Sequence, residues 1–202
     1  DAAGAQKELE RWTKLAPDSP ELKASRNEMK SNTGEGRQAL QQARLLGVAG
    51  KVDEAIAAYE KLYGGVPDDV DVAIEYWTLV ARLPSRHSEG VSQLKKLNAS
   101  APGNVSLLTS LAKQMFADNK PQEGFAYLAE MARSASGRGI AADMWFSEVK
   151  SMPVSKASVQ ALQQFLLQFP TGSVAANARV LLDQQQAQLQ DPTFRARTDG
   201  LA

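Results

Sequence analysis

Apolar and polar residues follow one another along this chain with the period of an α-helix, in short segments that are separated by polar turns. The pattern is clearest between Gly36 and Asp69, where a turn at Gly50 is followed by Ala55 and Tyr59. Residues four apart lie on the same face of a helix, so these two side chains point the same way. The pattern predicts pairs of amphipathic helices joined by tight turns.

The helix pairs recur at a fixed interval. A small residue stands twelve positions before each of four prolines, in the pairs Ala5 and Pro17, Ala55 and Pro67, Gly90 and Pro102, and Ser158 and Pro170. Gly124 has Ser136 where the proline would be, and from Ala55 onward the small residues lie 35, 34 and 34 positions apart. A 34-residue unit of two helices is typical of tetratricopeptide repeats. We therefore expect an all-α solenoid of antiparallel helix pairs, with these small residues where helices cross closely.

The repeat period divides the chain into expected units. Residues 1–19 form the second helix of an incomplete first repeat, residues 173–190 form half of a last repeat, residues 191–202 form a flexible tail, and four repeats lie between, at 36–69, 70–104, 105–138 and 139–172. The expected helices run near 36–48, 53–63, 70–82, 88–99, 105–117, 121–133, 139–150, 155–168 and 173–189. Asp53, Ser88, Asn104 and Ser155 are suitable N-caps, and Pro121 is suited to a first helical position.

One interval exceeds the period. Ala5 and Ala55 are 50 positions apart, and the surplus of 16 maps to Ser19–Glu35. Leu22 and Met29 give that segment a thin apolar stripe. We expect an extra helix at 20–35 that interrupts the stack, and a hinge at Gly34 and Gly36, because glycine tolerates a wide range of backbone angles.

Composition adds little chemistry to this picture. Among 202 residues, 23 basic side chains balance 23 acidic ones, which weighs against nucleic acid or anionic lipid as the main partner. Cysteine is absent, and the sole histidine, His87, is expected in an exposed loop. Asp68, Asp69 and Asp71 are interpreted as a solvated turn before a helix. We expect no catalysis, no cofactor, no metal and no membrane span in this fragment.

A solenoid of this kind binds partners on the concave face that its first helices line. The repeat register places ten candidate partner-binding residues there: Arg37, Leu40, Arg44, Asp71, Thr78, Thr109, Lys113, Phe116, Asp143 and Lys150. Ile74 is expected on the same face. Trp77 and Trp145 are expected to pack against neighbouring helices instead. The face is polar and nearly balanced in charge, without the clustered Lys and Asn that tetratricopeptide adaptors use to grip a peptide carboxylate.

Several stretches together resemble a narrower family. They are QQARLLGVAGKVDEAIAAYEKLYGG, AIEYWTLVARLPSRHSEGVSQLKKL, GFAYLAEMA and ALQQFLLQFP. They are similar to the tetratricopeptide-repeat region of the cellulose-export protein of bacterial cellulose synthase, and the likeness covers most of residues 1–190. In that family the repeats lie in the periplasm, between the inner-membrane synthase and an outer-membrane pore.

The resemblance implies a non-catalytic periplasmic scaffold whose full-length form is attached to the outer membrane. Its partners would be other cellulose synthase subunits or periplasmic proteins, and it would help to guide the glucan toward the pore. Two alternatives stay open at this point. One is a module that binds cellulose directly, and the other is a repeat adaptor of another pathway.

Overall fold

The computed structural model describes residues 33–191 and seven isolated positions before them, namely Gly4, Lys7, Glu8, Arg11, Lys14, Ser19 and Ser25. Within these residues every regular element is a helix, as the repeat pattern predicts. The chain divides into two compact units, Asp1–Pro102 and Gly103–Ala202. Most of the expected first half-repeat and of the extra helix at 20–35, and the tail after Asp191, lie outside the described residues. Gly34 and Glu35, expected in the extra helix, instead begin the helix Gly34–Val48.

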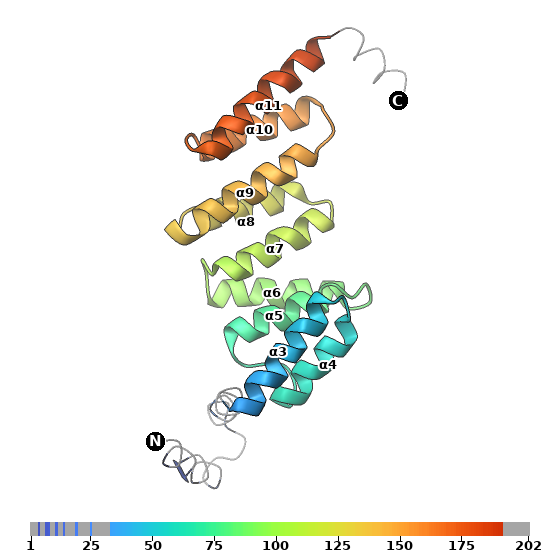
Figure 1. Ribbon diagram of the computed structural model, residues 1–202, viewed down its shortest axis with the longest axis vertical. Coiled ribbons are helices and arrows are strands. Elements are labelled where there is room, and N and C mark those ends of the chain that lie inside the picture. Colours follow the sequence, from blue (N-terminus) through green and yellow to red (C-terminus); the bar gives the residue numbers. More distant parts are fainter. Residues whose placement is uncertain are drawn as a thin grey trace. The chain divides into compact units, whose positions relative to one another are not determined.

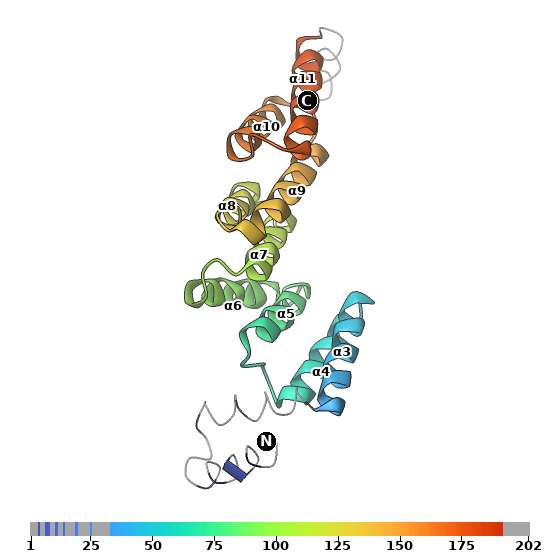
Figure 2. The ribbon, with the colours of Figure 1, turned by 60° about the vertical axis from the view of Figure 1, so that its left-hand side comes forward.

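The first unit contains four described helices, α3 (Gly34–Val48), α4 (Val52–Tyr63), α5 (Val70–Val80) and α6 (His87–Ser100). Here α3 packs on α4, α4 on α5, and α5 on α6 (Figure 1). The second unit contains α7 (Val105–Ala117), α8 (Pro121–Met131), α9 (Ala135–Ser151), α10 (Lys156–Gln168) and α11 (Ser173–Gln190). Here α7 packs on α8, α9 on both α8 and α10, and α10 on α11 (Figure 2). Each unit is thus a stack of helical hairpins, which is the predicted repeat architecture.

Polar side chains at the helix starts explain most of the boundaries. Asn104 accepts a hydrogen bond from the Leu107 amide at 3.1 Å, and Ser155 caps α10 in the predicted way. Asp69 caps α5 by accepting from the Val72 amide at 3.0 Å. The predictions for two other caps are wrong: α4 starts after Lys51 and α6 after Arg86, so neither Asp53 nor Ser88 occupies the N-cap.

The start of α9 also differs from the prediction. The helix begins at Ala135, four residues before the expected Gly139, because the Ser134 hydroxyl accepts a hydrogen bond from the Gly137 amide at 3.0 Å. Ser136, which the repeat places where a proline would follow the preceding helix, instead lies in the first turn of α9. Helix α8 has already ended at Met131.

His87 and Ile74 are more buried than the sequence pattern predicts. His87 is the first residue of α6 and is half-buried, with Nδ1 2.6 Å from the carbonyl oxygen of Ala81. A carbonyl oxygen only accepts, so Nδ1 carries the proton in this contact. Ile74 is 3% exposed and belongs to the core, because α5 is covered on several sides by its neighbours.

Four of the repeat's small residues, Ala55, Gly90, Gly124 and Ser158, are buried between packed helices, whereas Ala5 lies outside the described residues. Ala55 and Ser158 are fully buried. A Cβ atom on Gly90 of α6 would lie 2.4 Å from the backbone nitrogen of Ala81, at the end of α5. A Cβ atom on Gly124 of α8 would lie 2.6 Å from the ring of Phe116 on α7. These approaches confirm the packing role that the period assigned to the small residues.

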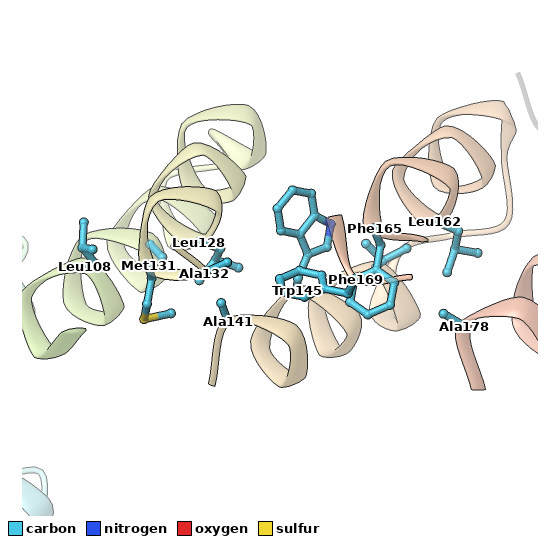
Figure 3. Close-up of a cluster of buried hydrophobic side chains, with 12 residues drawn as sticks. Leu108, Leu128, Met131, Ala132, Ala141, Trp145, Leu162, Phe165, Phe169 and Ala178 are labelled. Carbon is cyan, nitrogen blue, oxygen red and sulfur yellow. The ribbon is translucent and has the colours of Figure 1, made fainter. Parts of the chain in front are cut away.

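The core of the second unit runs through α7, α8, α9, α10 and α11. Figure 3 shows Trp145 of α9 between Leu128 of α8 and its C-cap Ala132 on one side and Phe165 and Phe169 on the other. Trp145 is 6% exposed, and Trp77 in the first unit is 8% exposed. Both tryptophans therefore pack in the core, as predicted.

Candidate interaction surface

The first unit carries five of the ten candidate residues. Arg37, Leu40 and Arg44 lie on α3, and Asp71 and Thr78 lie on α5. Arg37, Arg44 and Asp71 are exposed, whereas Leu40 and Thr78 are half-buried. This face of the unit therefore presents both signs of charge.

Arg44 is held by a carboxylate that the sequence pattern did not indicate. Its Nε and Nη2 atoms each donate to Glu75 of α5, both at 2.8 Å, and so form a bidentate ion pair between α3 and α5. The hydroxyl of Tyr59 on α4 donates to the same carboxylate at 2.7 Å. The hydrogen bonds to Glu75 raise the pKa of Arg44. Arg44 therefore belongs to a hydrogen-bonded group that joins α3, α4 and α5.

Burial of the phenol and its bond to Glu75 raise the pKa of Tyr59. The neutral phenol is therefore the form that donates this hydrogen bond over the whole physiological range. Bidentate guanidinium–carboxylate pairs and charge-assisted hydrogen bonds are the stronger polar contacts in proteins. The three helices meet at one carboxylate that accepts three such bonds.

A second set of polar contacts joins α4 to α5 and closes the start of α6. The hydroxyl of Tyr76 donates to Glu60 of α4 at 2.7 Å, and burial together with this bond raises the pKa of Tyr76 to about 12. Arg86 donates to both oxygens of Glu89, at 2.8 and 3.1 Å, and this pairing lowers the pKa of Glu89. These contacts, too, stabilise packing between or at the ends of helices.

The second unit carries the other five candidates. Lys113 of α7 is exposed, as are Asp143 and Lys150 of α9. Asp143 and Lys150 are seven positions apart, so they share one face of α9. These three charged groups reach solvent and are available to a partner.

Thr109 and Phe116 serve packing as well. The Thr109 hydroxyl donates to the carbonyl of Val105, one turn earlier on α7, at 2.7 Å. The Phe116 ring is half-buried, covers Gly124 and meets Phe125 of α8 edge to face at 5.1 Å between ring centroids. Phe116 remains a candidate contact only through the part of its ring that reaches solvent.

The two glycines of the expected hinge begin α3. Gly36 is buried, and its amide donates to the side chain of Thr33, the N-cap of the helix, at 2.9 Å. The segment on the other side of the hinge lies outside the described residues. A hinge at Gly34 and Gly36 therefore stays a prediction.

The described part of the chain offers no acidic or imidazole cluster able to hold a metal ion. Across that same part, helices are too short or too polar to span a bilayer. What residues 33–191 do present is a set of exposed, mixed charges along the first helix of each pair.

Comparison with known proteins gives the family. The chain is 50% identical to a crystallised flexible tandem repeat domain from a bacterial cellulose synthase subunit, with a TM-score of 0.68 over 94% of this chain and 78% of that one. The chain belongs to this tandem-repeat family. No protein-family model matches it.

Longer relatives share the similarity. Cellulose synthase operon protein C of Salmonella typhimurium is 48% identical, and that of Escherichia coli K12 is 49% identical, each over the whole of this chain. The protein of the same name from Xanthomonas axonopodis is 27% identical over 98% of the chain. The chain spans only 17% and 18% of the length of the first two relatives, respectively.

Proposed function

We propose that this chain is a non-catalytic periplasmic scaffold of the bacterial cellulose synthesis and export machinery. It binds other cellulose synthase subunits or periplasmic proteins through the exposed charges of its first helices. The observation that carries the proposal is the likeness to the tandem repeat domain of a cellulose synthase subunit, at 50% identity and a TM-score of 0.68. The periplasmic location and the attachment of the full-length protein to the outer membrane are inferred from the family.

The burial of the aromatic rings favours protein partners over the glucan. Sugar chains are commonly held on exposed aromatic faces, and here Trp77 and Trp145 are 8% and 6% exposed. Phe169, next to Trp145, is 4% exposed. In residues 33–191 the large rings are thus used for packing, and the half-exposed Phe116 already faces Phe125. A direct cellulose-binding module is the second candidate, and Phe116 is the ring it would use.

The scaffold proposal is tested by retention of defined subunits. The immobilised chain is incubated with detergent-solubilised cellulose synthase subunits encoded with it, and bound subunits are identified by mass spectrometry. We expect retention of at least one of them and its loss when Lys113→Glu and Lys150→Glu are combined. Lys113→Glu and Lys150→Glu are also made singly, and Lys156→Glu is the matched control for each, because it makes the same charge change as either one at an exposed position at the start of α10.

A parallel titration with cello-oligosaccharides separates the two candidates. The scaffold proposal expects no heat of binding in calorimetry. Binding of the oligosaccharide that Phe116→Ala abolishes, without retention of any subunit, would replace the scaffold by the glucan-binding module. We also propose a hinge at Gly34 and Gly36, which agrees with the flexibility named for the related tandem repeat domain. Small-angle scattering of Gly34→Ala and Gly36→Ala variants tests that hinge.

A further inference from the structure

Helices α4 and α5 exchange hydrogen bonds through two adjacent pairs of residues. Tyr59 of α4 donates to Glu75 of α5, and Tyr76 of α5 donates to Glu60 of α4, each at 2.7 Å. Each helix thus supplies one phenol and one carboxylate. The two rings meet edge to face, with centroids 6.4 Å apart. We call these four residues the Tyr–Glu clasp.

The clasp restrains the two helices at more than one point. Adjacent residues on a helix point about 100° apart, so the two hydrogen bonds leave each helix in different directions. A single bond would let the helices rotate about it, whereas two separated bonds oppose that rotation. The bidentate pair of Arg44 with Glu75 extends the restraint to α3.

Neighbouring helices of the second unit meet through rings instead. Phe125 of α8 stacks on Trp145 of α9 with centroids 4.8 Å apart. Trp145 in turn meets Phe169, just after α10, at 5.9 Å. These ring–ring contacts carry no formal charge. Arg138 of α9 also lies over the Phe169 ring at 5.5 Å and donates to the carbonyl of Gln168 at 3.0 Å, and salt screens such contacts with neutral groups less than it screens an ion pair. The two units therefore use different chemistry at comparable joints.

We propose that the Tyr–Glu clasp, together with Arg44, is a conformational device that fixes the angle between the α3–α4 pair and α5 and loosens as ionic strength rises. The Arg44 and Glu75 side chains are 50% and 35% exposed, so salt reaches their ion pair. The clasp hydrogen bonds are half-buried and keep the helices together when the ion pair is screened. High salt therefore widens the range of angles without unfolding the unit.

Distance measurement between spin labels tests the device, since the chain has no cysteine of its own. Gln38→Cys on α3 and Ser92→Cys on α6 are exposed positions that report on the first unit. Gln122→Cys on α8 and Gln163→Cys on α10, also exposed, report on the second. Raising NaCl from about 20 mM to about 1 M shortens the screening length to about 3 Å, and we expect it to broaden the first distance distribution about twofold while the second stays unchanged.

Substitutions separate the clasp from a general effect of salt. Glu75→Gln should give the broad distribution at low salt, and Tyr76→Phe, which keeps the ring and removes only the hydroxyl, should give part of it. Glu54→Gln is the matched control, because it removes the same charge outside the clasp. In the described part of the chain, the Glu54 carboxylate forms its ion pair with Lys51, at the start of α4. Circular dichroism at 222 nm checks that every variant remains folded.

Three results would overturn the proposal. The first is a distribution in the first unit that neither salt nor Glu75→Gln broadens. The second is equal broadening in both units. The third is broadening by Glu54→Gln as large as that by Glu75→Gln, which would make net charge the cause.

Discussion

Gly90 of α6 has no room for a side chain in the described fold. A Cβ atom there would lie 2.4 Å from the nitrogen, 2.7 Å from the Cα and 2.8 Å from the Cβ of Ala81. Ordinary van der Waals contact starts at 3.4 Å, so the closest approach falls about 1 Å short of it. None of these three atoms is the end of a flexible side chain. Gly90→Ala must therefore move backbone at the end of α5 or the start of α6.

The size of the effect follows from two opposing contributions. Overpacking of a core costs about 1–3 kcal/mol, and a contact with backbone falls at the upper end of that range. Replacing glycine by alanine in a helix returns about 1 kcal/mol. We expect Gly90→Ala to lower the free energy of unfolding by about 2 kcal/mol, which is about 4–8 °C in Tm for a domain of this size.

Two other glycines provide the comparison. At Gly124 the obstructing atoms belong to the half-buried Phe116 ring, which can turn, so Gly124→Ala should cost less than Gly90→Ala. Gly139 lies within α9 with no heavy atom within 4 Å of the added Cβ. Gly139→Ala should therefore stabilise α9 by about 0.5–1 kcal/mol.

Urea unfolding monitored by circular dichroism gives the free energy of unfolding of each of the three variants and so ranks them. Hydrogen exchange measured on peptides from α5, α6 and α9 shows which helices change. A Gly90→Ala protein as stable as Gly139→Ala would refute the close crossing of α5 and α6 and with it the packing role of the repeat's small residues.

Three further predictions concern single contacts. The Ser158 hydroxyl donates to the buried side-chain oxygen of Gln185 at 2.7 Å, and Ser158→Ala removes that donor. The free energy of unfolding measured in urea should fall by about 1–3 kcal/mol, and adding Gln185→Leu to the same chain should recover part of the loss. The pKa of Tyr76 is raised to about 12 from an ordinary value of about 10, so its phenol ionises in the unfolded chain before it ionises in the folded one. Stability should therefore fall as pH rises from about 10 to 12, and it should fall less steeply in Tyr76→Phe, which thermal melts across that range would measure. Asn119 has φ +56°, so Asn119→Val should lower Tm whereas Asn119→Gly should be tolerated.

The sequence predicts the helices well because a helix inside a hairpin must carry its own apolar stripe. Helix α7 has the predicted bounds, Val105–Ala117, with Asn104 as its cap. The start of α9 is harder to predict, because Ser134 and Ser136 could both cap a helix and the structure uses Ser134, whose hydroxyl accepts a hydrogen bond from the Gly137 amide. Local pattern predicts that a helix is present, but it does not decide between neighbouring capping residues.

The candidate surface is harder to predict for a different reason. The repeat register identifies which side chains point away from the second helices, but it does not say which of them pair with each other. Arg44 illustrates the difference, since its partner Glu75 lies 31 positions away and belongs to the next helix pair. A signal does exist in hindsight: the dipeptide Tyr59-Glu60 and the reversed dipeptide Glu75-Tyr76 stand on neighbouring helices.

The repeat period and the contacts between successive helix pairs therefore depend on different residues of this chain. The 34-residue period persists because two helices of a pair cross closely only at a small residue, and Gly90 and Gly124 show that requirement directly. Contacts between successive pairs have no such requirement, because either hydrogen bonds or rings can fill them. Between α4 and α5 the first unit uses phenol–carboxylate bonds, with an ion pair to α3, whereas between α8 and α9 the second unit uses stacked rings. Helix pairs of equal length can consequently differ in how their joints respond to salt, and that difference lies in residues that the repeat leaves free to vary.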